Sequence, residues 1–435
     1  MLKPARFLAI AAVFSLGACG GAAGGGGGSG GKAGGSGGGG SGGSGGGSGG
    51  NVGSGGAGTG GTTDAGMPPT GSGGATPDGA VVDMGPGTTD APGETPNQGP
   101  ARSFVYASGY SAPITIFALN TTTGALTPAG MATTGTGGEP TSLAFSPDKR
   151  FLYAGDEQKD QPMSRIIAFS INQTTGALQE INREGTRGAT NAHLALHPSG
   201  KWLLTANYDT GDVTVFAIRA DGGLSPAMAP VTAGGQAHYI VFDSTGTFVY
   251  VPCIAAGHVA MFRFSEGVLT PNNPPSVAVS GGPRHLALSP DERFAYLLGQ
   301  GSSAVTTFTH DKTLGRLTVL ETVTTTSSGS VGAHIAVHPS GKFVYASNRS
   351  DNSIAIFTVN LATGRLSPAT FQRGMISYPW WFGMDAAGQF LIVANDRTNS
   401  VLVHRIDQVA GTLTPLGMPV SVAPRPTFVG VLSLP

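Results

Sequence analysis

The sequence predicts an all-β protein in which one seven-bladed β-propeller (residues 101–435) follows a disordered Gly/Ser-rich linker. Two observations predict this fold. An aromatic residue at the start of an apolar run recurs at positions 104, 151, 202, 248, 294, 343 and 390, and subtracting these positions gives spacings of 46 to 51 residues. Each period also holds several short alternating runs punctuated by Gly, Pro, Asn and Asp, a pattern typical of four-stranded propeller blades.

Residues 1–18 have the organisation of a secretory signal peptide. Two basic residues precede a short apolar run that could not span a membrane as a helix. The following residues, Leu16-Gly17-Ala18-Cys19, resemble the lipobox of bacterial lipoproteins. This resemblance implies cleavage before Cys19 and lipidation of its thiol, so we expect a membrane anchor and a place in the cell envelope. The alternative is an ordinary signal peptide that a cysteine follows by chance.

Residues 19–100 form a low-complexity segment dominated by Gly, Ser, Thr, Ala and Pro. Such a segment cannot bury enough apolar surface to offset the conformational entropy lost on ordering. We therefore expect a flexible tether between the anchor and the propeller.

The repeats share one order of elements. An apolar strand, a Pro-Asp or Pro-Ser-Gly turn, an aromatic residue and a second strand follow one another in 143–154 and again in 193–204. A third strand, such as 354–359, leads through a Thr-Gly turn to a fourth. These turn residues suit tight connections between antiparallel strands.

The first repeat, which begins near Arg102, lacks the strand that precedes the aromatic residue elsewhere. The C-terminal stretch 426–432 has the character of that missing strand. We expect it to pair with the first repeat and close the ring, since closure removes exposed sheet edges.

Charge and composition narrow the function. The formal net charge is −1 and 11% of residues are charged, which argues against a nucleic-acid partner. Cys253 follows an apolar run and is expected to be a buried, small apolar residue. The sequence holds no zinc-finger spacing, no Gly-x-Ser-x-Gly elbow and no phosphate-binding loop. We expect no metal, no cofactor and a monomer that binds a small molecule.

Four histidines stand at almost the same place in successive repeats: His193, His238, His285 and His334. Equivalent positions in a radial array point to the same end of the ring, so we expect these imidazoles near one mouth, together with Arg284 and Arg349. Trp380 and Trp381 hold the matching place in the last repeat. Such a mouth suits a small anionic lactone or sugar-like ligand, since arginine can grip an anion with two hydrogen bonds. The alternative is a structural role between blades for each His and Trp.

Several phrases of the sequence resemble the propeller lactonase family, which includes bacterial 6-phosphogluconolactonases and fungal muconate cyclases. The resemblance covers about 103–434, and the phrases that support it are 104–110, 203–208, 282–285 and 345–349. The repeats are also similar to those of bacterial surface-repeat propellers. The family resemblance implies lactone hydrolysis.

The resemblance also implies site residues. The family site lies at one mouth of the channel and uses a His, two Arg and a Glu, which implies catalytic roles for His238, Arg284 and Arg349. The expected Glu of the fifth repeat is replaced by Gln300, which cannot act as an acid or a base. Glu157 matches another acid position of the family and is the remaining catalytic candidate. The residues expected to bind substrate are His193, His285, Gln300, His334 and Trp381.

Three functions remain open from the sequence. In the first, a lactonase uses His238 as the base for water, and the arginine pair stabilises the oxyanion. In the second, the same mouth binds a small anion or a carbohydrate without catalysis, which the glutamine at position 300 favours. In the third, an envelope propeller presents its rim to other proteins.

Overall fold

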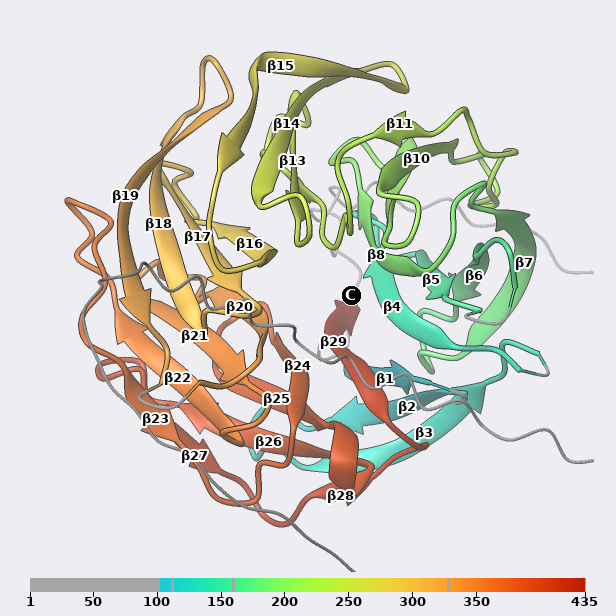
Figure 1. Cartoon of the computed structure of the whole chain (residues 1–435). Coiled ribbons are helices and arrows are strands. Elements are labelled where there is room, and N and C mark those ends of the chain that lie inside the picture. The colour runs from blue at the N-terminus through green and yellow to red at the C-terminus, as the bar shows by residue number, and fades with distance from the viewer. Residues whose placement is uncertain (1–101, 111–112, 136, 159–160, 327–328, 435) are drawn as a thin grey trace, which may run out of the picture. The chain divides into compact units, whose positions relative to one another are not determined.

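The computed structural model describes residues 102–434, apart from 111–112, 136, 159–160 and 327–328. These residues form seven antiparallel sheets arranged as blades around a common axis, which confirms the predicted propeller (Figure 1). The predicted signal peptide (1–18), Cys19 and the tether (19–100) lie outside the described residues. No helix within the described part of the chain has the length and apolar character that a membrane crossing requires.

The blades contain four or five strands each, and one short 3₁₀ helix, η1 (Asp396–Thr398), lies in the last blade. Grouped by blade from the innermost strand outward, the strands are β29 (Pro426–Leu434), β1 (Arg102–Gly109), β2 (Ile114–Leu119) and β3 (Leu126–Ala132); β4 (Pro140–Phe145), β5 (Phe151–Asp156), β6 (Arg165–Ile171) and β7 (Leu178–Gly185); β8 (Asn191–Leu196), β9 (Trp202–Asn207), β10 (Asp212–Ala217) and β11 (Val231–Thr232); β12 (Val241–Phe242), β13 (Phe248–Cys253), β14 (His258–Ser265) and β15 (Val268–Ala278); β16 (Pro283–Leu288), β17 (Phe294–Gly299), β18 (Ala304–Asp311) and β19 (Arg316–Thr324); β20 (Gly332–Val337), β21 (Phe343–Asn348), β22 (Ser353–Thr358) and β23 (Thr370–Gln372); β24 (Pro379–Met384), β25 (Phe390–Asn395), β26 (Ser400–Ile406), β27 (Leu413–Pro415) and β28 (Val420–Ser421).

The innermost strands contact one another in a closed cycle, in which β4 meets β8, β8 meets β12, and so on through β24 and β29 back to β4. The C-terminal strand β29 completes the first blade by pairing with β1 from Arg102↔Leu434 to Gly109↔Pro426. The predicted closure of the ring is therefore confirmed.

The recurrent aromatic residue locks one blade to the next. Phe294 begins β17 and packs beneath Gly364, which lies in the Thr-Gly turn of the neighbouring blade with φ of 73°. A Cβ on Gly364 would lie 2.3 Å from the Phe294 ring, so this turn requires glycine both for its backbone and for this contact. The nearby Tyr296 hydroxyl donates to the Gly364 carbonyl at 3.1 Å.

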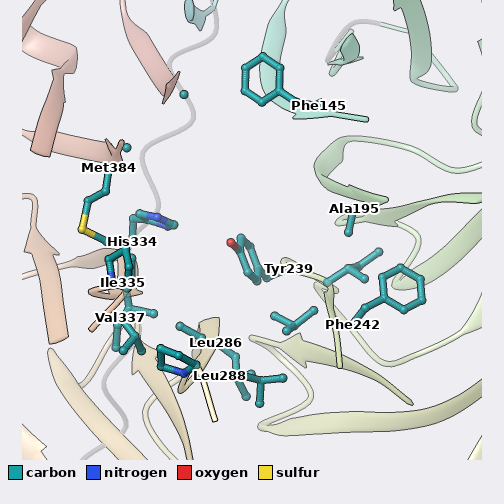
Figure 2. A pocket seen from close by; sticks show the side chains of 18 of the residues that line it. Phe145, Ala195, Tyr239, Phe242, Leu286, Leu288, His334, Ile335, Val337 and Met384 are labelled. Atoms are coloured by element: carbon teal, nitrogen blue, oxygen red, sulfur yellow. The ribbon is translucent and has the colours of Figure 1, made fainter. Parts of the chain in front are cut away.

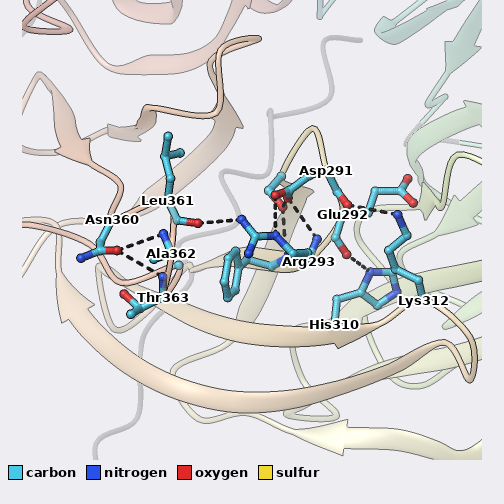
Figure 3. Close-up of polar contacts among 12 residues, drawn as sticks. Asp291, Glu292, Arg293, His310, Lys312, Asn360, Leu361, Ala362 and Thr363 are labelled. Atoms are coloured by element: carbon cyan, nitrogen blue, oxygen red, sulfur yellow. Dashed lines mark hydrogen bonds and ion pairs between the residues drawn. The ribbon is translucent and has the colours of Figure 1, made fainter.

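Polar contacts close the outer end of the same junction (Figure 3). The Arg293 side chain binds Asp291 at 2.6 Å within its own turn and donates to the carbonyl of Leu361 in the next blade at 2.7 Å. The Asn360 side chain accepts two backbone N–H groups of that neighbouring turn and holds its shape.

The core lies between the blades, and the second strand of each blade is its most buried part. All six residues of β13, β17, β21 and β25 are buried. Cys253, the last residue of β13, is fully buried and a free thiol, as the sequence predicts.

Candidate functional site

The innermost strands of most blades begin with a β-bulge, and this bulge builds the site. In β16 the pairing with β17 shifts between Pro283 and His285, which leaves Arg284 as an extra residue. The same shift marks β4, β8, β20 and β24. A bulge changes the direction of the side chains beside it. Here Arg284 and His285 are adjacent in sequence and their side chains meet, since the Arg284 guanidinium donates to the His285 ring at 3.0 Å. Each bulged strand can therefore supply two adjacent side chains to the channel.

One register-equivalent residue from each blade fills the axis of the channel. The seven members of this plug layer are Ser142, His193, Tyr239, His285, His334, Trp381 and Phe428. Neighbouring rings stack closely, with centroids 3.8 Å apart for His193 and Tyr239 and 3.7 Å apart for His334 and Trp381. His193 and Trp381, from opposite sides, are 6.0 Å apart. The plug layer therefore separates the two ends of the channel.

His238 lies one residue out of register with the other three histidines, although the four rings lie close together, with centroids 5.1 Å apart for His238 and His285. Val241 pairs with Tyr250 as Ala287 pairs with Tyr296, so Tyr239 is the equivalent of His285. His238 stands one residue earlier, level with Arg284. It therefore belongs to the mouth above the plug layer.

Two buried arginines meet at this mouth. The Arg284 Nε and the Arg349 Nη2 both donate to the side-chain oxygen of Gln300, at 3.1 and 3.3 Å. Arg284 also donates to the carbonyl of Ala333, and Arg349 to the carbonyl of Gly332 at 3.4 Å. The exposed fractions of Arg284 and Arg349 are 2% and 6%. The Nε of Arg349 is buried without a partner among the described residues.

Neither arginine forms an ion pair with another described residue. Within the part of the chain that the structure describes, no carboxylate lies within ion-pair distance of Arg284 or Arg349. Burial, and after it the charge of Arg349, holds the pKa of Arg284 well below its ordinary value. Burial likewise lowers the pKa of Arg349. An incoming anion would relieve this cost, because it would pair with buried cations that have only neutral hydrogen-bond partners.

The histidines of the plug layer are neutral and hold fixed tautomers. A guanidinium can only donate, so the Nε2 of His285 accepts from Arg284 and its proton lies on Nδ1. That Nδ1 donates to the Nδ1 of His334 at 3.0 Å. Burial holds the pKa of His285 and of His334 well below the ordinary value and lowers the pKa of His193 to about 3. These imidazoles support Arg284 from below.

His238 is the imidazole that faces the mouth. Its ring lies 5.1 Å from that of His285 and makes an edge contact with Tyr208 at 5.7 Å between centroids. Its Nδ1 is buried and has no partner among the described residues. Burial, followed by the charges of Arg284 and Arg349, keeps the pKa of His238 well below 6.5. A neutral imidazole with a lone pair to spare can accept a proton.

A second set of equivalent residues surrounds the mouth. Each member directly follows the second strand of its blade, six residues after the recurrent aromatic (104 + 6 = 110, for example). The mouth layer comprises Tyr110, Glu157, Tyr208, Ile254, Gln300, Arg349 and Asp396. Glu157, Gln300 and Arg349 were expected here from the resemblance, whereas Tyr110 and Tyr208 were not expected as site residues. The constant offset from the aromatic is the signal that could have found them.

Aromatic rings form the wall next to the arginines. The Arg349 guanidinium lies 4.5 Å from the Trp380 ring and 5.7 Å from the Tyr378 ring, and Arg284 lies 5.9 Å from Trp380. Tyr378 has a φ of 51°, which is rare for a bulky residue, and its N–H donates to Asn352 at 2.7 Å. Tyr378 was not expected as a site residue. Trp381, which was expected to bind substrate, lies in the plug layer below.

Glu157 lies in the same mouth layer, on the second blade. It is 5% exposed, and its N–H donates to the Glu139 carbonyl at 3.0 Å. Burial and then the charge of Glu157, which hydrogen-bonds Tyr110, raise the pKa of that tyrosine. Burial and then the charge of Asp209 raise the pKa of Tyr208, while the charges of Arg284 and Arg349 lower it.

The chain is similar to known proteins over this whole region. Residues 104–431 match the family described as "Lactonase, 7-bladed beta-propeller". The 6-phosphogluconolactonase of Bacillus subtilis (strain 168) is 29% identical over 196 residues, which are 43% of this chain and 56% of that protein. The match thus spans about half the length of this curated relative.

Solved structures match over more of the chain. The periplasmic gluconolactonase of Pseudomonas aeruginosa is 26% identical with a TM-score of 0.72, covering 77% of this chain and 100% of that one. A putative 6-phosphogluconolactonase from Bacteroides fragilis is 26% identical with a TM-score of 0.71, covering 79% of this chain and 100% of that one.

Proposed function

We propose that this chain, which belongs to the seven-bladed β-propeller lactonase family, hydrolyses an anionic sugar lactone at the mouth that contains Arg284 and Arg349. The observation that supports the proposal is the convergence of these two buried guanidiniums on one neutral amide beside the neutral His238, with no carboxylate of the described residues within ion-pair distance. Such a site favours an anionic ligand and a developing oxyanion for the same electrostatic reason.

The mechanism uses a water molecule and the lactone. His238 accepts a proton as the water oxygen bonds to the lactone carbonyl carbon, and the resulting oxyanion is stabilised by the arginines. The ring C–O bond then breaks, and the leaving oxygen takes the proton back from the His238 imidazolium. The product is the open-chain hydroxy acid. Gln300 holds both arginines and takes no part in proton transfer, and Glu157 is the alternative base.

The plug-layer residues selected as substrate-binding, His193, His285, His334 and Trp381, enter this proposal in a supporting role. His285 receives a hydrogen bond from Arg284 and passes its own to His334, which stacks on Trp381. We propose that they fix the position of Arg284 and form the floor beneath the lactone. His334 contacts His285 and reaches Arg284 only through it. We therefore expect His334→Ala to lower kcat by displacing Arg284.

The first test compares two sugar lactones that differ in charge. D-glucaro-1,4-lactone carries a free carboxylate, and D-glucono-1,4-lactone, which has the same ring size, is neutral. We expect kcat/KM to be at least about tenfold higher for the anionic lactone at low salt, and this preference to shrink as salt screens the arginines. Acid release by the purified protein in a pH-stat measures both. Equal rates for the two lactones, or a preference for the neutral one, would contradict the proposed substrate class.

The low pKa of His238 predicts an unusual pH dependence. The neutral imidazole is the active form, and protonation stops catalysis only when the pH falls below the lowered pKa. We therefore expect kcat to stay nearly constant from pH 8 down through 6.5, where an ordinary histidine would already be half protonated. His238→Gln should reduce kcat by about 10²–10⁴-fold. A midpoint of the wild-type profile near 6.5 would show that His238 is not the base in this environment.

A binding module without catalysis is the second candidate, and Gln300 is the observation that favours it. If the family requires a carboxylate at this position, the mouth retains its arginines for an anion but lacks the acid. Under this alternative no lactone is hydrolysed, while D-glucaro-1,4-lactone still raises the melting temperature of the protein.

We further propose a place in the cell envelope through a lipid on Cys19. The lipobox-like residues support this location, and the Pseudomonas aeruginosa relative is named as periplasmic. An envelope protein would meet unphosphorylated sugar lactones more often than phosphorylated ones. Mass spectrometry of the N-terminal peptide checks the lipid, and Cys19→Ser should release the protein from the membrane fraction. An unmodified peptide that starts elsewhere would contradict the anchor.

A further inference from the structure

The end of the channel opposite the arginines opens into a chamber of about 820 Å³ (Figure 2). Its wall comes from the last residue or residues of the innermost strands, beyond the plug layer. One equivalent residue of every blade is large and apolar: Phe145, Leu196, Phe242, Leu288, Val337, Met384 and Val431. All seven are only half-buried, whereas the second strands beside them are fully buried. The chamber therefore exposes apolar surface that the ring could otherwise have covered.

Small residues make room between this apolar wall and the plug layer. Ala195, Ala287, Ala336 and Gly383 stand one position before the large apolar residues and line the chamber. Pockets that hold small molecules measure about 300–1,000 Å³ and are mostly apolar with a few polar groups. The chamber meets both criteria.

Tyr239 brings a hydroxyl group to the floor of the chamber, which the His334 ring also lines. The Tyr239 ring is stacked between His193 and His285, at 3.8 and 4.3 Å, so its hydroxyl projects toward the axis (Figure 2). Among the described residues, none forms a hydrogen bond with this hydroxyl. Burial raises the pKa of Tyr239, so the hydroxyl keeps its proton and is available as a donor.

The electrostatics of the chamber are opposite to those of the arginine mouth. Its lining includes the carboxylates Asp243, Glu292 and Asp385 and contains no Lys or Arg among the described residues. These carboxylates already accept backbone N–H groups, of Phe248, Ser244 and Phe390 respectively. Because their charge remains uncompensated by a cation in the chamber, anions are disfavoured there.

We propose that this chamber is a second binding site, which takes a neutral, mostly apolar molecule with one hydrogen-bond acceptor for the Tyr239 hydroxyl. The seven apolar side chains provide the affinity, since a ligand removes them from water. The rim carboxylates exclude anions, and the hydroxyl orients the ligand. The plug layer separates this ligand from the lactone site, and the inference does not depend on the proposed lactonase activity.

A fluorescent probe of this chemistry tests the proposal. Prodan is a neutral naphthalene with a ketone acceptor, and its emission shifts to the blue in apolar surroundings. We expect saturable binding to the purified protein with a blue shift. Leu288→Gln, which puts an amide into the apolar wall, and Ala336→Leu, which fills the space beneath it, should each weaken binding at least about tenfold. Tyr239→Phe should weaken it about fivefold, the loss of one hydrogen bond.

The control places the same change on an apolar residue outside the chamber. Val319 in β19 is 49% exposed, and Val319→Gln should leave Prodan binding unchanged. Neutral 2-acetylnaphthalene should displace Prodan, and the anion 2-naphthoate should not. The proposal is overturned by absent saturable binding, by wild-type affinity in Leu288→Gln and Ala336→Leu variants that keep the wild-type melting temperature, or by equal displacement by the anion.

Discussion

Replacing Arg284 with methionine is expected to lower kcat/KM for D-glucaro-1,4-lactone by about 10²–10³-fold, the usual cost of removing one oxyanion-stabilising group. Methionine keeps much of the buried volume and removes both the charge and the donors to Gln300 and His285. If Arg284 stabilises the transition state, kcat should fall along with kcat/KM. Initial rates over a range of lactone concentrations, followed by acid release, give both constants.

The matched control is Arg293→Met. Arg293 lies in the turn that follows β16 and is paired with Asp291 at an exposed position far from the mouth layer. Exposed pairs of this kind contribute little to stability, about 0–1 kcal/mol, so the variant should hydrolyse lactones at the wild-type rate. An Arg284→Met protein that keeps the wild-type fold and wild-type kcat/KM would remove Arg284 from the mechanism.

Deleting residues 426–434 is expected to abolish cooperative folding. This strand, β29, pairs with β1 along its whole length and completes the cycle of innermost strands. It buries four large apolar side chains: Phe428, Val429, Leu432 and Leu434. At roughly 1.5–3 kcal/mol each, their burial contributes about as much as the whole stability of a typical domain, roughly 5–15 kcal/mol. The truncated chain should therefore lack the sharp thermal transition of the full chain, as followed by circular dichroism.

Ser433→Ala serves as the control for this deletion. The Ser433 hydroxyl bonds that of Ser103 at 2.8 Å in the same strand pair, and its loss should change the melting temperature by a few degrees at most. Addition of a synthetic peptide of residues 426–434 should restore part of the transition. A truncated chain that melts cooperatively near the wild-type temperature would show that the ring does not need this strand.

The blade count and the closure could be predicted from the sequence because each depends on a local, repeated cause. An aromatic residue stands at the position of Phe294 in every blade because it must fill the space beneath a turn glycine such as Gly364. The missing strand of the first repeat had to be supplied from elsewhere in the chain, and 426–432 had the matching pattern. The bulges could not be predicted, since an extra residue leaves no mark on apolar alternation that covers only a few residues.

The charged residues of the site could be predicted from the sequence, but the position of each site residue along the channel axis could be predicted less well. Arg284, Arg349 and Gln300 were placed at one mouth by the resemblance, and the structure brings them into contact. A shift of one residue separates His238 from the other histidines, and the sequence carries its signal. The other three stand nine residues before the recurrent aromatic of their repeat, whereas His238 stands ten residues before Phe248. Tyr378 was missed because its left-handed backbone depends on Asn352 of another blade.

The mouth layer has a consequence for how such proteins diversify. Each of its residues stands just beyond the end of a strand, so its side chain can be exchanged without disturbing the backbone pairing within the sheet or the packing between blades. Seven such positions face one opening, so a change in a single blade alters the chemistry presented to a ligand, while contacts such as that between Gln300 and Arg349 couple some of the positions. A common scaffold can in this way acquire new specificities by single steps, and position 300, where the resemblance implies a glutamate and this chain has a glutamine, is a place to look for one.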